Sequence, residues 1–455
     1  MKKLSEIIFF LGLFLVLLLP PFDPDLGWHL RCGELMIKEG GFCRENHFST
    51  LLNGYQWTNH HWLYQILLFL IWKKFDLWGL TIFNALIVTL ALSLFNLTIK
   101  NWKLEKKWAI LLALVFSWNV FNLGIRSQIL GILYFLALLF LLSGQRKSSR
   151  FLLLLTFLLW ANTHGSVVFG LIFLFLFSLK NFWKNFFFLV LSILSSIINP
   201  FGWKIFFEAW RHLTIPLEKL IAEWVPPEPF KRTIVFLGGI SLLFLTEKFS
   251  WPTILSLSFL ALKARRNLPF FFFFFFFLLF KSHFFQKWLS SWKRKKSLRS
   301  DLLTFTSLTL FFYGLFIRLP QTLRINSSFQ NYCQTSPLTY PYEAITFLKQ
   351  QPEKGNLFNR YEWGGFLIWQ LKEYKVFIDG RMPAWPTPSG KSPYTIYLET
   401  LQTKPGWQET LTNYDINWIL ISPETFMDLK LKPNPEKFGW KEVWRDKKSV
   451  IYKKV

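Results

Sequence analysis

Residues 129–142 read ILGILYFLALLFLL, an uninterrupted apolar run, and basic residues follow it at Arg146 and Lys147. Similar runs recur along the first 320 residues and predict membrane-spanning helices. Of the 455 residues, 52% are hydrophobic and 17% are charged, which is too apolar for an ordinary soluble enzyme. The sequence therefore predicts an integral membrane protein that is mainly α. It excludes a disordered chain, and three cysteines are too few for a small disulfide-rich scaffold.

The apolar runs predict a polytopic bundle of about 11 spans. They cover about residues 4–20, 77–99, 108–122, 125–143, 151–162, 165–180, 185–198, 232–247, 250–263, 267–281 and 301–318. The first run ends at Leu19-Pro20-Pro21 without a small-residue cleavage site, so we interpret it as a retained anchor. We interpret the apolar segment 61–75 as non-crossing, because a crossing there would reverse the topology downstream. The run of phenylalanines at 270–277 receives no functional role.

The distribution of charge predicts the orientation. The net charge is +25, and cationic residues gather in short loops at 100–107, 144–150, 181–184 and 281–300. An excess of Lys and Arg marks cytoplasmic loops, which explains the charge without a nucleic-acid partner. The sequence thus predicts a cytoplasmic N-terminus. Three stretches then lie on the outer face, namely 20–60, 199–231 and the tail from about 320.

Two domains are predicted. Residues 1–319 form the transmembrane domain, with a first outer loop at about 20–61. Residues 320–455 form a small extracytoplasmic α/β domain, because short β-like runs at 376–378, 418–422 and 449–452 alternate with amphipathic segments rich in turn residues.

Two carboxylates, Asp23 and Asp25, begin the first outer loop, and His29 follows them. Charge at a lipid boundary is costly, and a partly desolvated carboxylate can accept a proton from an attacking hydroxyl. Alternatively, the two residues end the first span and cap a helix over 27–38. Spacing alone leaves both readings open and does not choose between the two carboxylates.

Further polar residues recur at the predicted outer ends of other spans. Arg126, His164, Glu223 and Arg266 are far apart in sequence, yet one topology puts them all on the face that carries the two carboxylates. The planar fork of arginine suits a phosphate or pyrophosphate. The alternatives are ordinary loop charges for the arginines and a hydrogen-bonded bundle histidine for His164. For Arg265 and Arg266 a further alternative is that the count of spans before them is off by one.

Histidines and cysteines in the first outer loop raise the question of a metal. Zinc is conceivable, but the spacing of His47, His60 and His61 fits no standard zinc signature and Cys43 is the one cysteine nearby, so zinc is not the leading hypothesis. Cys32 and Cys43 are compatible with an extracytoplasmic disulfide and equally with two thiols.

Several motifs resemble a broad prokaryotic group of multi-spanning proteins that looks like part of the GT-C glycosyltransferase superfamily. That superfamily includes protein O-mannosyltransferases, aminoarabinose transferases and the oligosaccharyltransferase catalytic subunit. The motifs are Asp23-Pro24-Asp25-Leu26-Gly27-Trp28-His29-Leu30, Trp160-Ala161-Asn162-Thr163-His164-Gly165, Asn199-Pro200-Phe201-Gly202-Trp203, Glu223-Trp224, Tyr361-Glu362-Trp363-Gly364-Gly365 and Ile378-Asp379-Gly380-Arg381.

The resemblance implies that the protein lies in a prokaryotic cytoplasmic membrane. It also implies a catalytic acid in the first outer loop, at Asp23 or Asp25, and a sugar donor built on a polyprenyl phosphate. For the oligosaccharyltransferase branch it also implies a divalent metal bridging these two residues, whereas many GT-C members look metal-independent. In the tail, residues 361–366 are similar in part to the Trp-Trp-Asp-Tyr-Gly acceptor motif of oligosaccharyltransferases. The likeness implies substrate binding by Glu362, Asp379 and Arg381. Read without the family, Gly364-Gly365 is a turn or helix start and Asp379-Gly380 a tight turn.

The sequence-based hypothesis is an inverting glycosyltransferase that acts on the outer face. Asp25 or Asp23 deprotonates the acceptor hydroxyl, while Arg126, His164 and Arg266 stabilise the departing lipid phosphate. His29, Glu223, Glu362, Asp379 and Arg381 complete the expected substrate-binding set. The rivals are a transporter or flippase for a lipid-linked glycan and a non-enzymatic membrane-anchored surface binding protein. The sequence identifies neither the sugar nor the acceptor, which is a glycan, a lipid or a protein.

Overall fold

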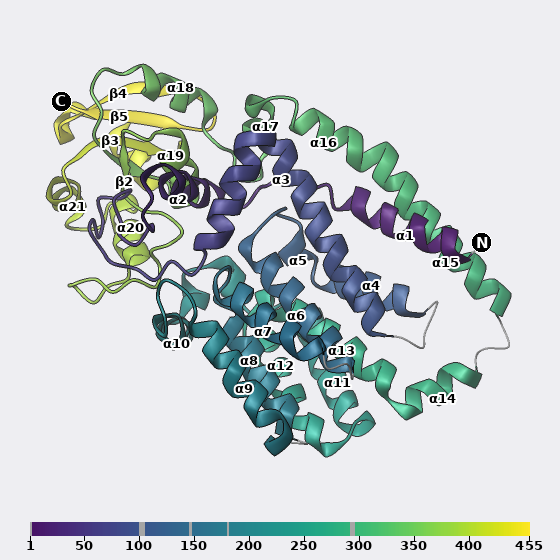
Figure 1. Ribbon diagram of the computed structural model, residues 1–455. Coiled ribbons are helices and arrows are strands. Elements are labelled where there is room, and N and C mark those ends of the chain that lie inside the picture. The colour runs from purple at the N-terminus through teal and green to yellow at the C-terminus, as the bar shows by residue number, and fades with distance from the viewer. Residues whose placement is uncertain (1, 100–104, 145–147, 180–181, 292–295) are drawn as a thin grey trace. The chain divides into compact units, whose positions relative to one another are not determined.

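The computed structural model describes residues 2–99, 105–144, 148–179, 182–291 and 296–455 (Figure 1). Parts of the four predicted basic loops lie outside these residues. The described chain packs into two compact units. The helical unit comprises Met1–Pro21 and Leu77–Leu323, and the mixed unit comprises Phe22–Asp76 and Arg324–Val455. By packing, residues 22–76 therefore belong with the tail, although the predicted domain boundary lies at residue 319.

The helical unit consists of helices joined by short turns. It opens with α1 (Lys2–Val16) and continues after the kink in α3 (Trp62–Thr98), where Asp76 has non-helical φ and ψ angles of 51° and −147°. The other helices are α4 (Glu105–Phe116), α5 (Trp118–Phe121), α6 (Ser127–Ser143), α7 (Ser148–Ala161), α8 (Val167–Ser178), α9 (Phe182–Ile197), α10 (Lys204–Thr214), α11 (Pro229–Leu245), α12 (Trp251–Lys263), α13 (Leu268–Lys281), α14 (His283–Ser291), α15 (Lys296–Tyr313) and α16 (Leu319–Ile325). Short 3₁₀-helical turns are η2 (Leu217–Lys219), η3 (Ala222–Trp224), η4 (Lys248–Ser250) and η5 (Arg265–Asn267), and η7 (Gly314–Arg318) is a π-helical turn.

The phenylalanine run forms α13, in the core of the helical unit. Phe270 to Phe274 are each at most 4% exposed. Their rings meet rings from other helices edge-on or stacked, with Phe273 and Phe95 centroids 5.0 Å apart and Phe272 and Phe116 centroids 4.8 Å apart. Aromatic pairs at such distances add to the energy of burial, so the run has a packing role.

Two described helical segments are long and apolar enough to cross a membrane, Trp62–Thr98 and Asp301–Ile325. Shorter apolar helices are Leu4–Val16, Ser127–Ser143, Phe151–Ala161, Val167–Ser178 and Asn185–Ile197. The mainly helical fold with a small C-terminal sheet agrees with the predicted fold class. The number of spans and their orientation stay predictions.

The mixed unit contains a five-stranded sheet of order β2-β1-β3-β5-β4. Its strands are β1 (Asn356–Asn359), β2 (Lys375–Val376), β3 (Ile416–Ile421), β4 (Trp440–Arg445) and β5 (Val450–Lys454). β1 pairs in parallel with β2 and β3, and β5 pairs antiparallel with β3 and β4. The predicted β-like runs at 376–378, 418–422 and 449–452 overlap β2, β3 and β5.

The helices of the mixed unit come from both of its segments. They are α2 (Leu26–Glu39), the part of α3 before Asp76, α17 (Phe329–Thr335), α18 (Tyr342–Gln350), α19 (Gly364–Gln370), α20 (Pro393–Leu401), α21 (Trp407–Asn413) and α22 (Phe426–Leu431), with the short turns η8 (Tyr361–Trp363) and η9 (Glu436–Phe438). The N-terminal segment also reaches the sheet edge, because Thr50 N donates to Val376 O at 2.8 Å and Val376 N donates to Phe48 O at 3.0 Å.

Candidate active site

The Asp23-Pro24-Asp25 segment leads directly into α2. Asp25 occupies the N-cap position, yet its side chain makes no capping hydrogen bond; its Oδ1 instead accepts from Trp28 Nε1 at 2.9 Å. Asp23 is 3% exposed, whereas Asp25 is partly exposed. The side chain of Asp25 thus has an orientation that helix capping does not explain.

Glycines of the tail pack against this segment at distances that no side chain could tolerate. A Cβ on Gly380 would lie 1.9 Å from Asp25 Oδ1, and a Cβ on Gly365 would lie 2.4 Å from Pro24 O. On the other side, a Cβ on Gly27 would lie 2.1 Å from Gly365 O. The structure therefore brings together three motifs that the sequence singled out, Asp23–Asp25, Gly364–Gly365 and Asp379–Arg381.

A buried ion pair flanks Gly380 on both sides. Asp379 is fully buried, and Arg381 donates to it from Nε and Nη2 at 2.7 Å each. Ser49 Oγ donates to Asp379 Oδ2 at 2.7 Å, and Arg381 Nη2 donates to Asn46 Oδ1 at 2.9 Å. Burial alone would raise the pKa of Asp379, but the charge and hydrogen bonds of Arg381 outweigh it and lower that pKa.

The guanidinium of Arg381 lies among aromatic rings. Its Cζ is 4.9 Å from the ring centroid of Phe48, 5.6 Å from that of Trp57 and 5.4 Å from that of Trp385. These are cation–π distances, and the side chain is 1% exposed. In this structure Arg381 therefore holds the tail to the loop at 46–57 and keeps Gly380 in place.

His29 is buried beside Trp28, whose ring centroid is 3.6 Å from its own. The rings of His61 and Tyr64 approach it edge-on, and Gln65 Nε2 lies 3.3 Å from His29 Nδ1. Within the described residues, no three or more His, Cys, Asp or Glu side chains are grouped so that they could hold a metal ion. The metal bridge that the resemblance implies for Asp23 and Asp25 therefore has no support among these residues, and no step is derived through a metal.

A disulfide joins Cys32 to Cys43, with Cα atoms 5.6 Å apart. Of the two alternatives that the sequence left open, the structure has the disulfide. It ties α2 to the loop that follows it. Cys333 is a buried thiol, and burial raises its pKa to about 12.

Glu34, which the sequence analysis did not select, gathers three cations. It is 4% exposed and accepts from Arg31 Nη1 at 2.8 Å, from Lys38 Nζ at 2.8 Å and from Lys372 Nζ at 2.7 Å. Burial raises the pKa of Glu34, but the three hydrogen-bonded cations lower it to about 2. The helical spacing of Arg31 and Lys38 is visible in the sequence, whereas Lys372 is 338 residues away.

In the helical unit, three of the sequence-selected residues form one cluster. Glu223 accepts from Arg126 Nη2 at 2.7 Å and from Arg266 Nη1 at 2.9 Å, and the Arg266 guanidinium lies 4.7 Å from the ring centroid of Trp224. Burial would raise the pKa of Glu223, but the two arginines lower it to about 2. Gln128 Nε2 donates to Arg266 O at 2.7 Å and fixes the turn that carries this arginine.

His164 and Glu362 lie outside these clusters. His164 is buried between α7 and α8, with its Nδ1 2.7 Å from Ser166 Oγ and 3.1 Å from Ser166 N. Glu362, in the turn before α19, accepts from Arg360 Nε at 2.8 Å, and its side chain is 40% exposed. The arginine cluster and His164 belong to the helical unit. The carboxylates, His29, Glu362 and the Asp379–Arg381 pair belong to the mixed unit.

The fold is similar to known structures along most of the chain. Archaeal oligosaccharyltransferase AglB from Archaeoglobus fulgidus, in complex with an inhibitory peptide and a dolichol-phosphate, matches with a TM-score of 0.58 and 12% identity, over 92% of this chain and 69% of that one. ArnT from Cupriavidus metallidurans, bound to undecaprenyl phosphate, matches with a TM-score of 0.54 and 13% identity, over 100% of this chain and 97% of that one. The apo A. fulgidus oligosaccharyltransferase matches with a TM-score of 0.54 and 11% identity, over 89% of this chain and 66% of that one.

No protein-family model and no curated protein matches the sequence. The structural likeness shows that the chain has a GT-C-like fold, as the sequence motifs implied.

Proposed function

We propose that this protein is a membrane glycosyltransferase that moves a sugar from a polyprenyl-phosphate donor to an acceptor on the extracytoplasmic face. Two structures of similar fold hold a polyprenyl phosphate, dolichol-phosphate in one and undecaprenyl phosphate in the other. The observation that carries the proposal is the position of Asp25, partly exposed and held between Trp28 and Gly380 in such a fold. This environment supports Asp25 as the base in preference to the buried Asp23.

The proposed reaction is a displacement at the anomeric carbon of the donor sugar. Asp25 accepts the proton of the acceptor hydroxyl, and the oxygen of that hydroxyl forms a bond to the anomeric carbon. The bond from this carbon to the phosphate oxygen breaks, and the lipid phosphate leaves with the electron pair. The Trp28 hydrogen bond and the contact with Gly380 restrict the carboxylate to one orientation, which limits the entropy lost on reaching the transition state.

We assign the departing phosphate to Arg126 and Arg266. Glu223 holds both guanidinium groups before a ligand arrives, and its low pKa keeps it ionised at neutral pH. A preorganised pair of arginines stabilises developing negative charge without reorganising during the reaction. The hydrogen bond between His164 and Ser166 favours a role for His164 in holding the turn between α7 and α8. The alternative role for this histidine is binding of the phosphate.

The proposed membrane arrangement follows the positive-inside distribution, with a cytoplasmic N-terminus and the mixed unit outside. The acceptor-binding assignment rests on Glu362, whose side chain is 40% exposed. Asp379 and Arg381 contribute by positioning, because both are buried in a hydrogen-bonded pair.

The test measures release of labelled sugar from a panel of polyprenyl-phosphate sugars by the purified full chain, with water as the default acceptor. Removing the base should lower the rate roughly 100-fold or more in Asp25→Asn. Asp415→Asn is the matched control, since Asp415 is exposed and adopts a φ of 48° that asparagine tolerates. Full activity in both Asp25→Asn and Asp23→Asn would disprove the base assignment. Binding of the donor lipid without transfer by the wild type would favour the transporter instead.

A further inference from the structure

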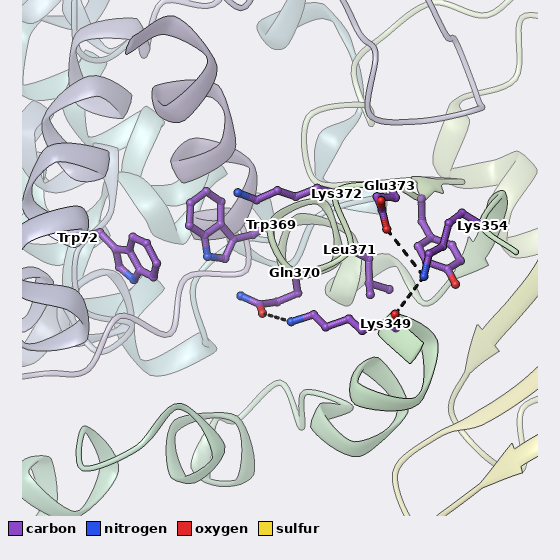
Figure 2. Close-up of a pocket in the computed structure, with 9 residues that line it drawn as sticks. Trp72, Lys349, Lys354, Trp369, Gln370, Leu371, Lys372 and Glu373 are labelled. Carbon is purple, nitrogen blue, oxygen red and sulfur yellow. Dashed lines mark hydrogen bonds and ion pairs between the residues drawn. The ribbon is translucent and has the colours of Figure 1, made fainter. Parts of the chain in front are cut away.

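The mixed unit contains a hollow of about 460 Å³ that the proposed reaction does not use (Figure 2). It lies beside the end of α18 and the turn between α19 and β2, with Trp72 of α3 contributing to its lining. Its volume falls within the roughly 300–1,000 Å³ typical of small-molecule sites. The hollow therefore has room for a ligand of small-molecule size.

The lining carries more positive than negative charge. Lys349, Lys354 and Lys372 line the hollow together with one carboxylate, Glu373. Lys354 lies 3.8 Å from Glu373, and Lys372 pairs at 2.7 Å with Glu34, which also pairs with Arg31 and Lys38.

Lys349 differs from the other two lysines in its hydrogen bonding. In the part of the chain that the structure describes, its ammonium donates to the neutral amide oxygen of Gln370 at 3.1 Å, and no carboxylate pairs with it there. The Lys349 residue is exposed, and partial burial of its ammonium lowers its pKa. An anion placed here would gain a charge-assisted hydrogen bond without displacing an existing ion pair.

Aromatic rings form another part of the lining. Trp72 and Trp369 meet nearly at right angles with centroids 4.9 Å apart, and the Lys372 ammonium lies 4.8 Å from the Trp369 centroid. In Figure 2 the two rings lie at one end of the hollow, while the amide of Gln370 meets the ammonium of Lys349 below them. Trp369 is 7% exposed, so the partly exposed Trp72 is the ring that can meet the C–H face of a pyranose, whereas the ammonium suits an acidic substituent.

We propose that this hollow binds a saccharide that carries a carboxylate or phosphate group. Trp72 and Lys349, whose ammonium has no carboxylate partner among the described residues, line the same hollow, and this combination favours a compact ligand over a membrane surface. The inference goes beyond the proposed transfer reaction, because it concerns binding and holds whichever sugar is transferred.

The test is isothermal titration of the detergent-purified full chain with trigalacturonate, with maltotriose as the neutral match and inorganic phosphate as the bare anion. Trigalacturonate should bind more tightly than either. Lys349→Gln removes the cation, and Gln370→Glu keeps the shape while supplying a carboxylate partner. Each should weaken binding roughly tenfold. Trp72→Leu should also weaken it, and Lys432→Gln, an exposed lysine away from the hollow, should leave it unchanged.

Equal binding of maltotriose would overturn the role of charge, and equal binding of phosphate with no effect of Trp72→Leu would overturn the role of the aromatic rings. An unchanged affinity in both Lys349→Gln and Gln370→Glu would place the ligand elsewhere. Absence of trigalacturonate binding by the wild type would overturn the proposal. Because none of these variants touches Asp25, the outcome is independent of the transfer experiment.

Discussion

Gly380 sets the position of the candidate catalytic carboxylate. It lies between Asp379 and Arg381, whose ion pair is buried, and it faces Asp25 Oδ1 with no room for a methyl group. The side chain of Asp25 is therefore confined by Gly380, whose backbone the ion pair in turn fixes. A substitution at Gly380 should therefore lower the rate of the proposed reaction although it removes no functional group.

We predict that Gly380→Ala lowers sugar release strongly while the protein stays folded. The new Cβ would lie 1.9 Å from Asp25 Oδ1, so the carboxylate must move, and a displacement of about 1 Å costs roughly 100-fold in rate. The measurement is sugar release alongside thermal unfolding. Gly41→Ala is the control, because nothing lies within 4 Å of a Cβ there. Unchanged release by Gly380→Ala would show that the orientation of Asp25 does not matter.

At the scale of elements, α2 is joined to α19 and the residues that follow it by three kinds of contact. Their backbones touch at Gly27 and Gly365, Asp25 meets Gly380, and Glu34 pairs with Lys372 just beyond the end of α19. Since α2 carries Asp25 at its start, these contacts anchor the candidate base to the tail. Glu34 is the ionic part of that anchor.

The low pKa of Glu34 predicts a defined dependence of stability on pH. A carboxyl whose folded pKa is about 2, against an ordinary value of 4.5, stabilises the fold above 4.5 and loses this contribution as the pH falls towards 2. Glu34→Gln should lower the melting temperature at pH 7. Between about pH 5 and pH 3, the melting temperature of this variant should fall less steeply than that of the wild type. Glu39→Gln, at an exposed site on the same helix, is the control. Parallel pH curves for Glu34→Gln and the wild type would contradict the assignment.

The sequence predicted the secondary-structure elements better than the tertiary contacts between them. The apolar runs located most helices, and the β-like runs in the tail located three strands, because both follow local periodicity. The motif resemblance selected Asp25, Gly365 and Gly380, which the structure brings together. It could not reveal the Lys372–Glu34 pair or the contacts of Arg381 with the rings of Phe48 and Trp57, since contacts between residues hundreds of positions apart leave no local pattern. The likeness also assigned Arg381 to substrate, and its burial favours a positioning role.

For the whole molecule, the first and last segments of the helical unit pack against each other. α1 packs along α15 and η7, where a Cβ on Gly12 would lie 2.9 Å from Phe311 N and a Cβ on Gly314 would lie 2.5 Å from Leu15 Cβ (Figure 1). Thr322 Oγ1 donates to Leu18 O at 2.7 Å beyond these contacts. Small residues at both crossings let the two backbones approach closely.

We predict that Gly12→Leu destabilises the helical unit by about 1–3 kcal/mol, because the added side chain must push α1 away from α15. The measurement is thermal unfolding of the purified full chain in detergent. Leu11→Ala is the control, since Leu11 is 44% exposed on the same helix. Equal melting temperatures for Gly12→Leu and the wild type would mean that α1 does not pack as closely as described.

Each unit is built from two segments of chain that interrupt one another, and this arrangement sets an order of events during translation. The segment 22–76 leaves the ribosome about 250 residues ahead of the segment from Arg324 onward with which it packs. At about 5–20 residues per second, the interval lasts roughly ten seconds to a minute. Throughout that time Asp25 has neither Gly365 nor Gly380 beside it. The candidate catalytic segment is therefore among the first parts of the protein to be synthesised and among the last to reach its final environment.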